Sequence, residues 1–193
     1  MPRSQRIWGF LLLPFLSYFL FVQRVVFLRA VNVGGTNRCR PAEIAKQLAK
    51  FDVVNIGAVG TFVVRKEVSE STLRAAITRK LPFQCEIMIC PARDIMKLTA
   101  KDPFPPQSSG SDIVRFVSVA ARRLDPPRSL ALSLPSEDDW LLKIIAIQDR
   151  FVLGLYRRQM KAIGYLGKIE KQLGMPLTTR NWSTIEKVTA ILS

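Results

Sequence analysis

The hydrophobic positions of this chain, from Val25 onward, alternate between the spacing of strands and the spacing of helices. The apolar, β-branched run Val25–Val31 ends at Asn32, which predicts a strand followed by a turn. Ile44 and Leu48 then recur at a helical spacing behind a proline suited to a first helical turn. The pattern further predicts short strands over Asp52–Ile56 and Thr61–Val64, a helix capped by Ser69 or Ser71, and a strand over Phe83–Cys90. This β-α-β-β-α-β order is that of a ferredoxin-like unit.

The second half of the chain repeats this order less regularly. A short helix over Pro91–Leu98 and a turn-rich linker over 101–111 precede it. Three prolines within 122–139 leave room there only for a short or broken helix. The other expected elements are a strand over Ile113–Ala120, a hairpin of Leu141–Ile147 with Phe151–Tyr156, a helix over Tyr165–Leu173 stopped by Gly174, a short run Leu177–Thr179, and a last helix whose capping box is Ser183 with Glu186. We therefore predict an α+β protein of two ferredoxin-like units, over 25–100 and 112–193, with a C-terminal helix closing the second.

The first 24 residues differ from the rest because they form a hydrophobic leader. The run Ile7–Val22 is almost wholly apolar and follows two arginines, as in a signal or anchor segment. It is shorter than the roughly 20 residues of a spanning helix, and no small-residue cleavage site follows it. Three interpretations stay open: a start assigned too far upstream, an uncleaved anchor and a signal peptide. We expect a cytoplasmic protein, with anchoring through residues 7–22 as the alternative.

The charge and composition of the chain limit its possible partners and reactions more than the spacing of its apolar residues does. The chain has 193 residues, with 29 Lys and Arg against 15 Asp and Glu, so its net charge of +14 favours anionic partners. It contains no His, which excludes Ser–His and Cys–His nucleophile pairs and His-ligated metals. The three cysteines lack zinc-like spacing, and we expect Cys85 and Cys90 to be buried thiols. We expect neither a cofactor nor a metal.

A first candidate site follows the opening strand. Arg29 shares a strand face with apolar neighbours, so its guanidinium must find an anionic or carbonyl partner. That partner is either a carboxylate of this chain or a bound phosphate or carboxylate. Asn32, Gly34 and Gly35 come next, and backbone N–H groups in such a turn favour an anion.

A second candidate site precedes the last helix. Two hydroxyls, an arginine, an amide and an indole stand together at Thr178, Thr179, Arg180, Asn181 and Trp182. Such a group suits a polar binding loop, and it equally suits a loop bonded to the body of the protein with Trp182 in the core.

These motifs give the chain a resemblance to a known family. The stretches Arg29-Ala30-Val31-Asn32-Val33-Gly34-Gly35, Tyr165-Leu166-Gly167-Lys168 and Thr179-Arg180-Asn181-Trp182-Ser183-Thr184 resemble hallmarks of the bacterial domain-of-unknown-function family number 1697. The resemblance covers residues 24–193 and implies paired ferredoxin-like units without an agreed activity. Family members commonly carry a Ser-Gly-Asn stretch where this chain has Gly57-Ala58-Val59-Gly60-Thr61.

Three functions fit these observations. We favour binding of a phosphate- or carboxylate-bearing ligand in a cleft between the two units, held by Arg29, Arg180 and the Gly34-Gly35 turn. One alternative is a nucleic-acid-binding module acting through the basic surface. The other is an enzyme acting on a small phosphorylated metabolite, for which the sequence identifies no catalytic residue; Glu43, Asp52, Glu67 and Glu86 are possible bases. A membrane partner depends on the leader, and the oligomeric state stays open.

Overall fold

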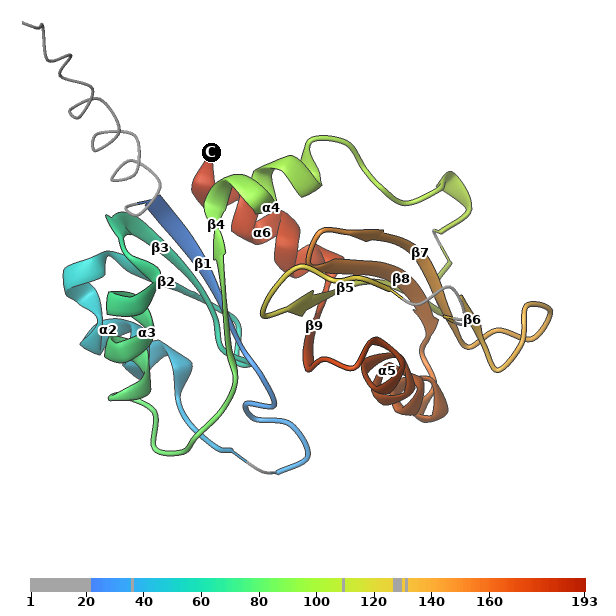
Figure 1. Cartoon of the computed structure of the whole chain (residues 1–193), viewed down its shortest axis with the longest axis horizontal. Helices are drawn as coiled ribbons and strands as arrows, with labels where there is room; N and C mark the ends of the chain where they lie inside the picture. The colour runs from blue at the N-terminus through green and yellow to red at the C-terminus, as the bar shows by residue number, and fades with distance from the viewer. Residues whose placement is uncertain (1–21, 36, 109, 127–129, 131) are drawn as a thin grey trace, which may run out of the picture.

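Two antiparallel sheets organise the computed structural model, which describes residues 22–193 apart from Thr36, Ser109, 127–129 and Ala131 (Figure 1). The first sheet has the order β2-β3-β1-β4 and the second the order β6-β7-β8-β5-β9. The strands of the first are β1 (Val22–Leu28), β2 (Val53–Ile56), β3 (Thr61–Val68) and β4 (Ile87–Pro91). Those of the second are β5 (Ile113–Ala120), β6 (Ser133–Leu134), β7 (Leu142–Gln148), β8 (Phe151–Arg157) and β9 (Leu177–Asn181).

The helices cover both outer faces and fill the space between the sheets (Figure 1). Helices α2 (Pro41–Gln47) and α3 (Glu70–Thr78) lie on the outer face of the first sheet, and α5 (Met160–Leu173) lies on the outer face of the second. Helices α4 (Ala92–Thr99) and α6 (Trp182–Leu192) lie together between the two sheets. Two short 3-10 turns, η1 (Ala49–Phe51) and η2 (Pro106–Ser108), complete the elements.

Strand alternation explains why each sheet is apolar on both faces. Along β1, Val25 and Phe27 point into a central hydrophobic cluster that also holds residues of α4, α6 and the second sheet. Val26 and Leu28 point the other way, into the cluster under α2 and α3. The central cluster therefore takes side chains from both halves of the chain, and the two sheets share one core.

The predicted limits of the first strand are wrong at both ends. β1 begins at Val22, so the last residues of the expected leader belong to the sheet, and Arg24 is 6% exposed there. The strand ends at Leu28 because the backbone turns left-handed at Ala30, where φ is +54°. The hydrophobic run up to residue 21 lies outside the described residues. Among the residues that are described, no helix is both long enough and apolar enough to cross a membrane.

The second half follows the predicted order with three corrections. The described residues of 122–139 contain no helix, and Ser133–Leu134 instead forms β6 against β7. Helix α5 begins at Met160, five residues before the predicted start, although it ends at the predicted Gly174 in the left-handed conformation. The β7–β8 hairpin is confirmed.

The third correction concerns the approach to the last helix. Leu177–Asn181 is a full strand, β9, at the edge of the second sheet rather than a short run before a loop. Pairing of Phe116 with Asn181 keeps the chain extended up to that residue. Helix α6 therefore begins at Trp182 with Asn181 as its N-cap, and the predicted capping by Ser183 is wrong.

Candidate functional site

The two motifs singled out in the sequence lie against each other where β1 ends and β9 begins. The Arg29 Nε–H donates to the carbonyl oxygen of Leu177 at 3.1 Å. The hydroxyl of Thr178 donates to the carbonyl oxygen of Leu28 at 3.2 Å. These contacts join the first sheet to the second, so the question becomes whether the polar groups there have room for a ligand.

Arg29 is neutralised by the protein itself. Its Nη2 lies 2.6 Å from the Oε1 of Glu170 on α5, and the other oxygen of that carboxylate accepts from the Leu177 N–H at 3.1 Å. Of the two partners foreseen for this guanidinium, the structure contains the carboxylate of this chain. Arg29 is therefore part of the contact between β1 and α5.

Arg180 uses all its hydrogen-bonding capacity inside the protein. A guanidinium has five N–H groups, and those of Arg180 donate to backbone carbonyls and to two hydroxyls. The acceptors are the carbonyl oxygens of Leu28, Val59, Gly60 and Thr179 and the side-chain oxygens of Thr61 and Thr178, at 2.7 to 3.4 Å. The side chain is 6% exposed, and burial lowers its pKa to about 10. Arg180 is therefore closed to a ligand, whereas the Arg29 side chain is 35% exposed and paired with Glu170. The predicted clamp of the two guanidinium groups gains no support from this arrangement and stays a prediction.

The hydroxyls and the amide of the two motifs are also used internally. The Asn32 amide donates to the carbonyl oxygens of Cys39 and Ala58, at 2.9 and 2.7 Å, and accepts from the Cys39 N–H. It thereby ties the β1–α2 loop to the β2–β3 turn. The Thr179 hydroxyl lies 2.6 Å from that of Ser118 across the β5–β9 pair. These predicted binding residues position the loop and the strand.

The Gly34-Gly35 turn lies beside an open depression of about 570 Å³. Gly34 and Gly35 have φ of +60° and +78°, a conformation that favours glycine. Asn32, Gly35, Arg38, Cys39 and Arg40 line the depression. Arg29 is turned away toward Glu170, so the turn lacks the partner that the sequence assigned to it. A phosphate cradle here stays a prediction.

A second depression, of about 310 Å³, lies at the start of α6, and we call it the α6 depression. The predicted residues Asn181 and Trp182 line it. Three groups that the sequence did not single out join them: Arg115 from β5, Arg158 from the end of β8 and Ser108 from η2. Ser183, in the first turn of the helix, also lines it.

Strand register brings these groups together. On β5, Phe116 pairs with Asn181 of β9, so Arg115 stands next to the start of α6. Ile113 pairs with Arg157 of β8, which places Arg158 at the same end of the sheet. An Arg-Arg pair at the end of one strand and an arginine near the start of another are visible in the sequence, but only the pairing of three strands shows that they meet.

The start of α6 is left without a side-chain cap. The Asn181 Oδ1 accepts from the hydroxyl of Tyr156 at 3.3 Å, and no side chain of the described residues accepts a hydrogen bond from the helix's first N–H groups. The first N–H groups of a helix carry a partial positive charge and favour an anion. The α6 depression thus opens onto the positive end of an 11-residue helix.

The two arginines that line the α6 depression differ in their ion pairs. Arg115 pairs with Asp102 at 3.1 Å and lies over the Phe104 ring. Arg158 is exposed and makes no ion pair with any described residue. The hydroxyl of Ser108, a residue that is 2% exposed, is buried without a hydrogen-bond partner among the described residues. Among the described residues, the site therefore offers a cation without an ion-pair partner, a helix start and a hydroxyl without a hydrogen-bond partner.

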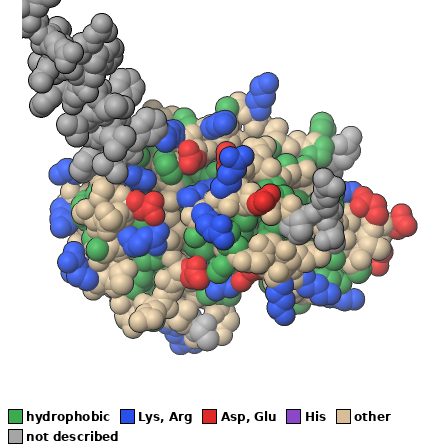
Figure 2. All heavy atoms as spheres, viewed as in Figure 1, with side chains coloured by type: hydrophobic (Ala, Val, Ile, Leu, Met, Phe, Trp, Pro, Cys, Tyr) green, Lys and Arg blue, Asp and Glu red, His purple; other side chains and the backbone are tan. Residues whose placement is uncertain are grey.

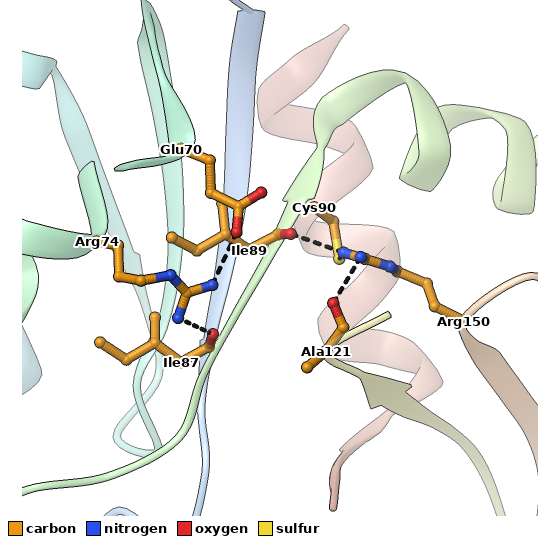
Figure 3. Close-up of polar contacts among 7 residues, drawn as sticks. All are labelled: Glu70, Arg74, Ile87, Ile89, Cys90, Ala121 and Arg150. Carbon is orange, nitrogen blue, oxygen red and sulfur yellow. Dashed lines mark hydrogen bonds and ion pairs between the residues drawn. The ribbon is translucent and has the colours of Figure 1, made fainter. Parts of the chain in front are cut away.

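Several arginines elsewhere are structural, which changes the meaning of the basic composition. Figure 3 shows Arg150, from the β7–β8 hairpin, donating to the carbonyl oxygens of Ile89 and Ala121 at 2.6 and 2.7 Å. In the same figure Arg74 bonds Glu70 and the Ile87 carbonyl. On the face drawn in Figure 2 the remaining Lys and Arg side chains are scattered among acidic and apolar ones. Part of the positive charge thus holds backbone together.

The thiols and acids present no nucleophile or metal site. Cys90 is buried, as predicted, and burial raises its pKa to about 11, so it is protonated at neutral pH. Cys85 was also expected to be buried but is only half-buried, as is Cys39, and partial burial raises the pKa of both thiols. Two of the possible bases have partners, Glu43 with Lys46 and Asp52 with Arg65. Within the described ranges no group of three or more Cys, Asp and Glu is placed to hold a metal.

The fold defines a mixed α/β protein with two antiparallel sheets. The family described as "Protein of unknown function (DUF1697)" matches residues 22–139, more than half of the chain, and the chain belongs to this family. The match confirms the resemblance inferred from the motifs, although it covers only the first of the three and ends before the other two.

The comparison with solved structures shows a similarity in fold. The chain is similar to a conserved bacterial protein, SP0830 from Streptococcus pneumoniae, with a TM-score of 0.59 and 16% sequence identity. The similarity covers 90% of this chain and 99% of that one. None of the curated proteins matches the chain.

Proposed function

We propose that this protein binds a small anionic ligand, carrying a phosphate or a carboxylate, in the α6 depression. The observation that carries the proposal is the uncapped start of α6 opening beside Arg158, a cation without an ion-pair partner among the described residues. An anion there accepts from the first N–H groups of the helix and is balanced by the guanidinium.

Three further side chains support the α6 depression as the anion site. Arg115 lies at the edge of the depression and adds positive charge, although Asp102 offsets part of it. Ser183 offers a hydroxyl in the first helical turn. Ser108 offers a second hydroxyl, which a bound oxygen would satisfy. The proposal keeps the anionic ligand expected from the sequence and moves it from the predicted cleft between the two units to the end of the second sheet.

Neither alternative, nucleic-acid binding or catalysis on a phosphorylated metabolite, is specifically favoured by an observation on the described residues. Nucleic-acid binding calls for a continuous basic surface, and the cations on the visible face are scattered (Figure 2). An enzyme on a phosphorylated metabolite commonly pairs an acid with a base beside the anion. Glu186 is the one carboxylate among the described residues lining the α6 depression, and it has no second such group beside it there.

Phosphate is expected to stabilise the protein through Arg158. At ten times its Kd, sodium phosphate adds about 1.4 kcal/mol to the free energy of unfolding, which raises Tm by about 3–5 °C for a chain of this size. The measurement is thermal unfolding in phosphate against chloride at matched ionic strength. Arg158→Gln should lose most of the increase, because it removes the unpaired cation.

Arg123→Gln is the matched control. Arg123 is 84% exposed and lies beside a different depression, so this variant should keep the increase. Equal increases in Tm for wild type and both variants would show that phosphate acts without the α6 depression.

We also infer that both units are ferredoxin-like. In the first, the element order β1-α2-β2-β3-α3-β4 with the sheet order β2-β3-β1-β4 supports this assignment. In the second unit, the order β7-β8-β5-β9 matches the order β2-β3-β1-β4 of the first, strand for strand. Strand β6 stands where the first helix of the second unit was expected.

A further inference from the structure

A second hollow continues the α6 depression along the helix. It measures about 350 Å³ and shares Trp182 and Glu186 with the first. Asp102, Thr99 and Thr189 line it farther along. We call the two hollows together the α6 groove. Trp182 is 5% exposed and packs edge-on against Phe104 with ring centroids 5.1 Å apart, so the shared part of the groove has a rigid aromatic base.

The charge along the α6 groove changes sign. Its start has Arg158 and the positive end of α6, whereas Glu186 stands where the two hollows meet. Asp102 lies beyond, paired with Arg115. Glu186 forms no ion pair with a described residue, although the chain carries a net charge of +14. Within the described part of the chain, the Glu186 carboxylate without a cation partner therefore lines the same groove as the Arg158 guanidinium without an anion partner.

The spacing of these groups is short. Ser183 and Glu186 are three residues apart on α6, which is about 4.5 Å along the helix axis and on one face. Both residues are exposed. A molecule with two charged ends separated by a two-carbon chain spans such a spacing.

We propose that the ligand of this site is a phosphate ester that carries a primary amine. Its phosphate lies at the start of α6 beside Arg158, and its ammonium faces the carboxylate of Glu186. This inference rests on the proposed function and adds the chemical class of the ligand. It needs no bond to be made or broken.

The test compares O-phosphoethanolamine with ethyl phosphate, which has the same chain length and no amine. Isothermal titration of the full-length protein should give a Kd about threefold lower for O-phosphoethanolamine, the size expected of one exposed ion pair. Glu186→Gln should abolish that difference and leave the affinity for ethyl phosphate unchanged or slightly higher. Glu67→Gln, at an exposed position on β3, is the control and should preserve the difference.

The outcomes separate the two proposals. Equal affinity of wild type for both compounds, or a difference that survives in Glu186→Gln, overturns the amine assignment and leaves the anion site standing. Failure of both compounds to bind overturns the anion site, and the amine assignment with it.

Discussion

Replacing Gly154 with alanine is expected to lower the free energy of unfolding by about 3 kcal/mol. Gly154 lies in β8, with β7 on one side and β5 on the other. An added Cβ would come within 2.5 Å of the Phe116 ring and closer still to the carbonyl oxygen of Lys143. Phe116 is 1% exposed and cannot move without disturbing the core under α5. Urea unfolding followed by far-UV circular dichroism measures the loss.

Gly164→Ala is the matched control for that substitution. Gly164 lies inside α5, and a Cβ there meets nothing within 4 Å. Because alanine favours the helix, this variant should gain about 0.5–1 kcal/mol. A loss of similar size in both variants would mean that the crowding around Gly154 is not what limits the position.

Replacing Arg180 with methionine is expected to cost about 3–5 kcal/mol, because several buried oxygens lose a charged donor and each buried acceptor left unsatisfied costs about 1–3 kcal/mol. The guanidinium joins β9 to the end of β1 and to the β2–β3 turn, so its loss leaves the carbonyl oxygens of Leu28 and Val59 buried without this donor. The measurement is again urea unfolding, with phosphate absent.

Arg29→Met is the comparison for Arg180. The Arg29 side chain is 35% exposed and its ion pair with Glu170 is partly solvated, so its loss should cost only about 1 kcal/mol. If Arg180→Met kept wild-type stability and instead lost phosphate binding, Arg180 would belong to a ligand site and its structural role would be refuted.

The spacing of apolar residues predicts those helices and strands whose limits are set by residues close by in the sequence. The β7–β8 hairpin has two apolar runs around a tight turn, and α5 has a glycine at its end, so both were recognised. The sequence does not indicate strand β9, because Leu177–Asn181 carries two threonines and an arginine and has the composition of a loop. Its strand conformation comes from pairing with β5, a contact between segments some 60 residues apart, such as Ser118 with Thr179.

The candidate site divides in the same way. A cluster of polar residues before the last helix pointed to Asn181 and Trp182, which do line the α6 depression. Arg180 stands out equally in the sequence, but whether a cation meets a ligand or six oxygens of the protein depends on distant backbone. The sequence does not single out Arg115 and Arg158, because each is an ordinary cation near the end of a strand. Only the register of β5, β8 and β9 places the two arginines at the same end of the sheet.

The location of the anion site is tested most directly by an NMR titration of the ¹⁵N-labelled protein with sodium phosphate. We predict that the backbone amide signals of Trp182, Ser183 and Thr184 shift saturably, with those of Gly34 and Gly35 unchanged. Saturable shifts at Gly34 and Gly35 without shifts at the start of α6, or no saturable shift at all, would contradict the account.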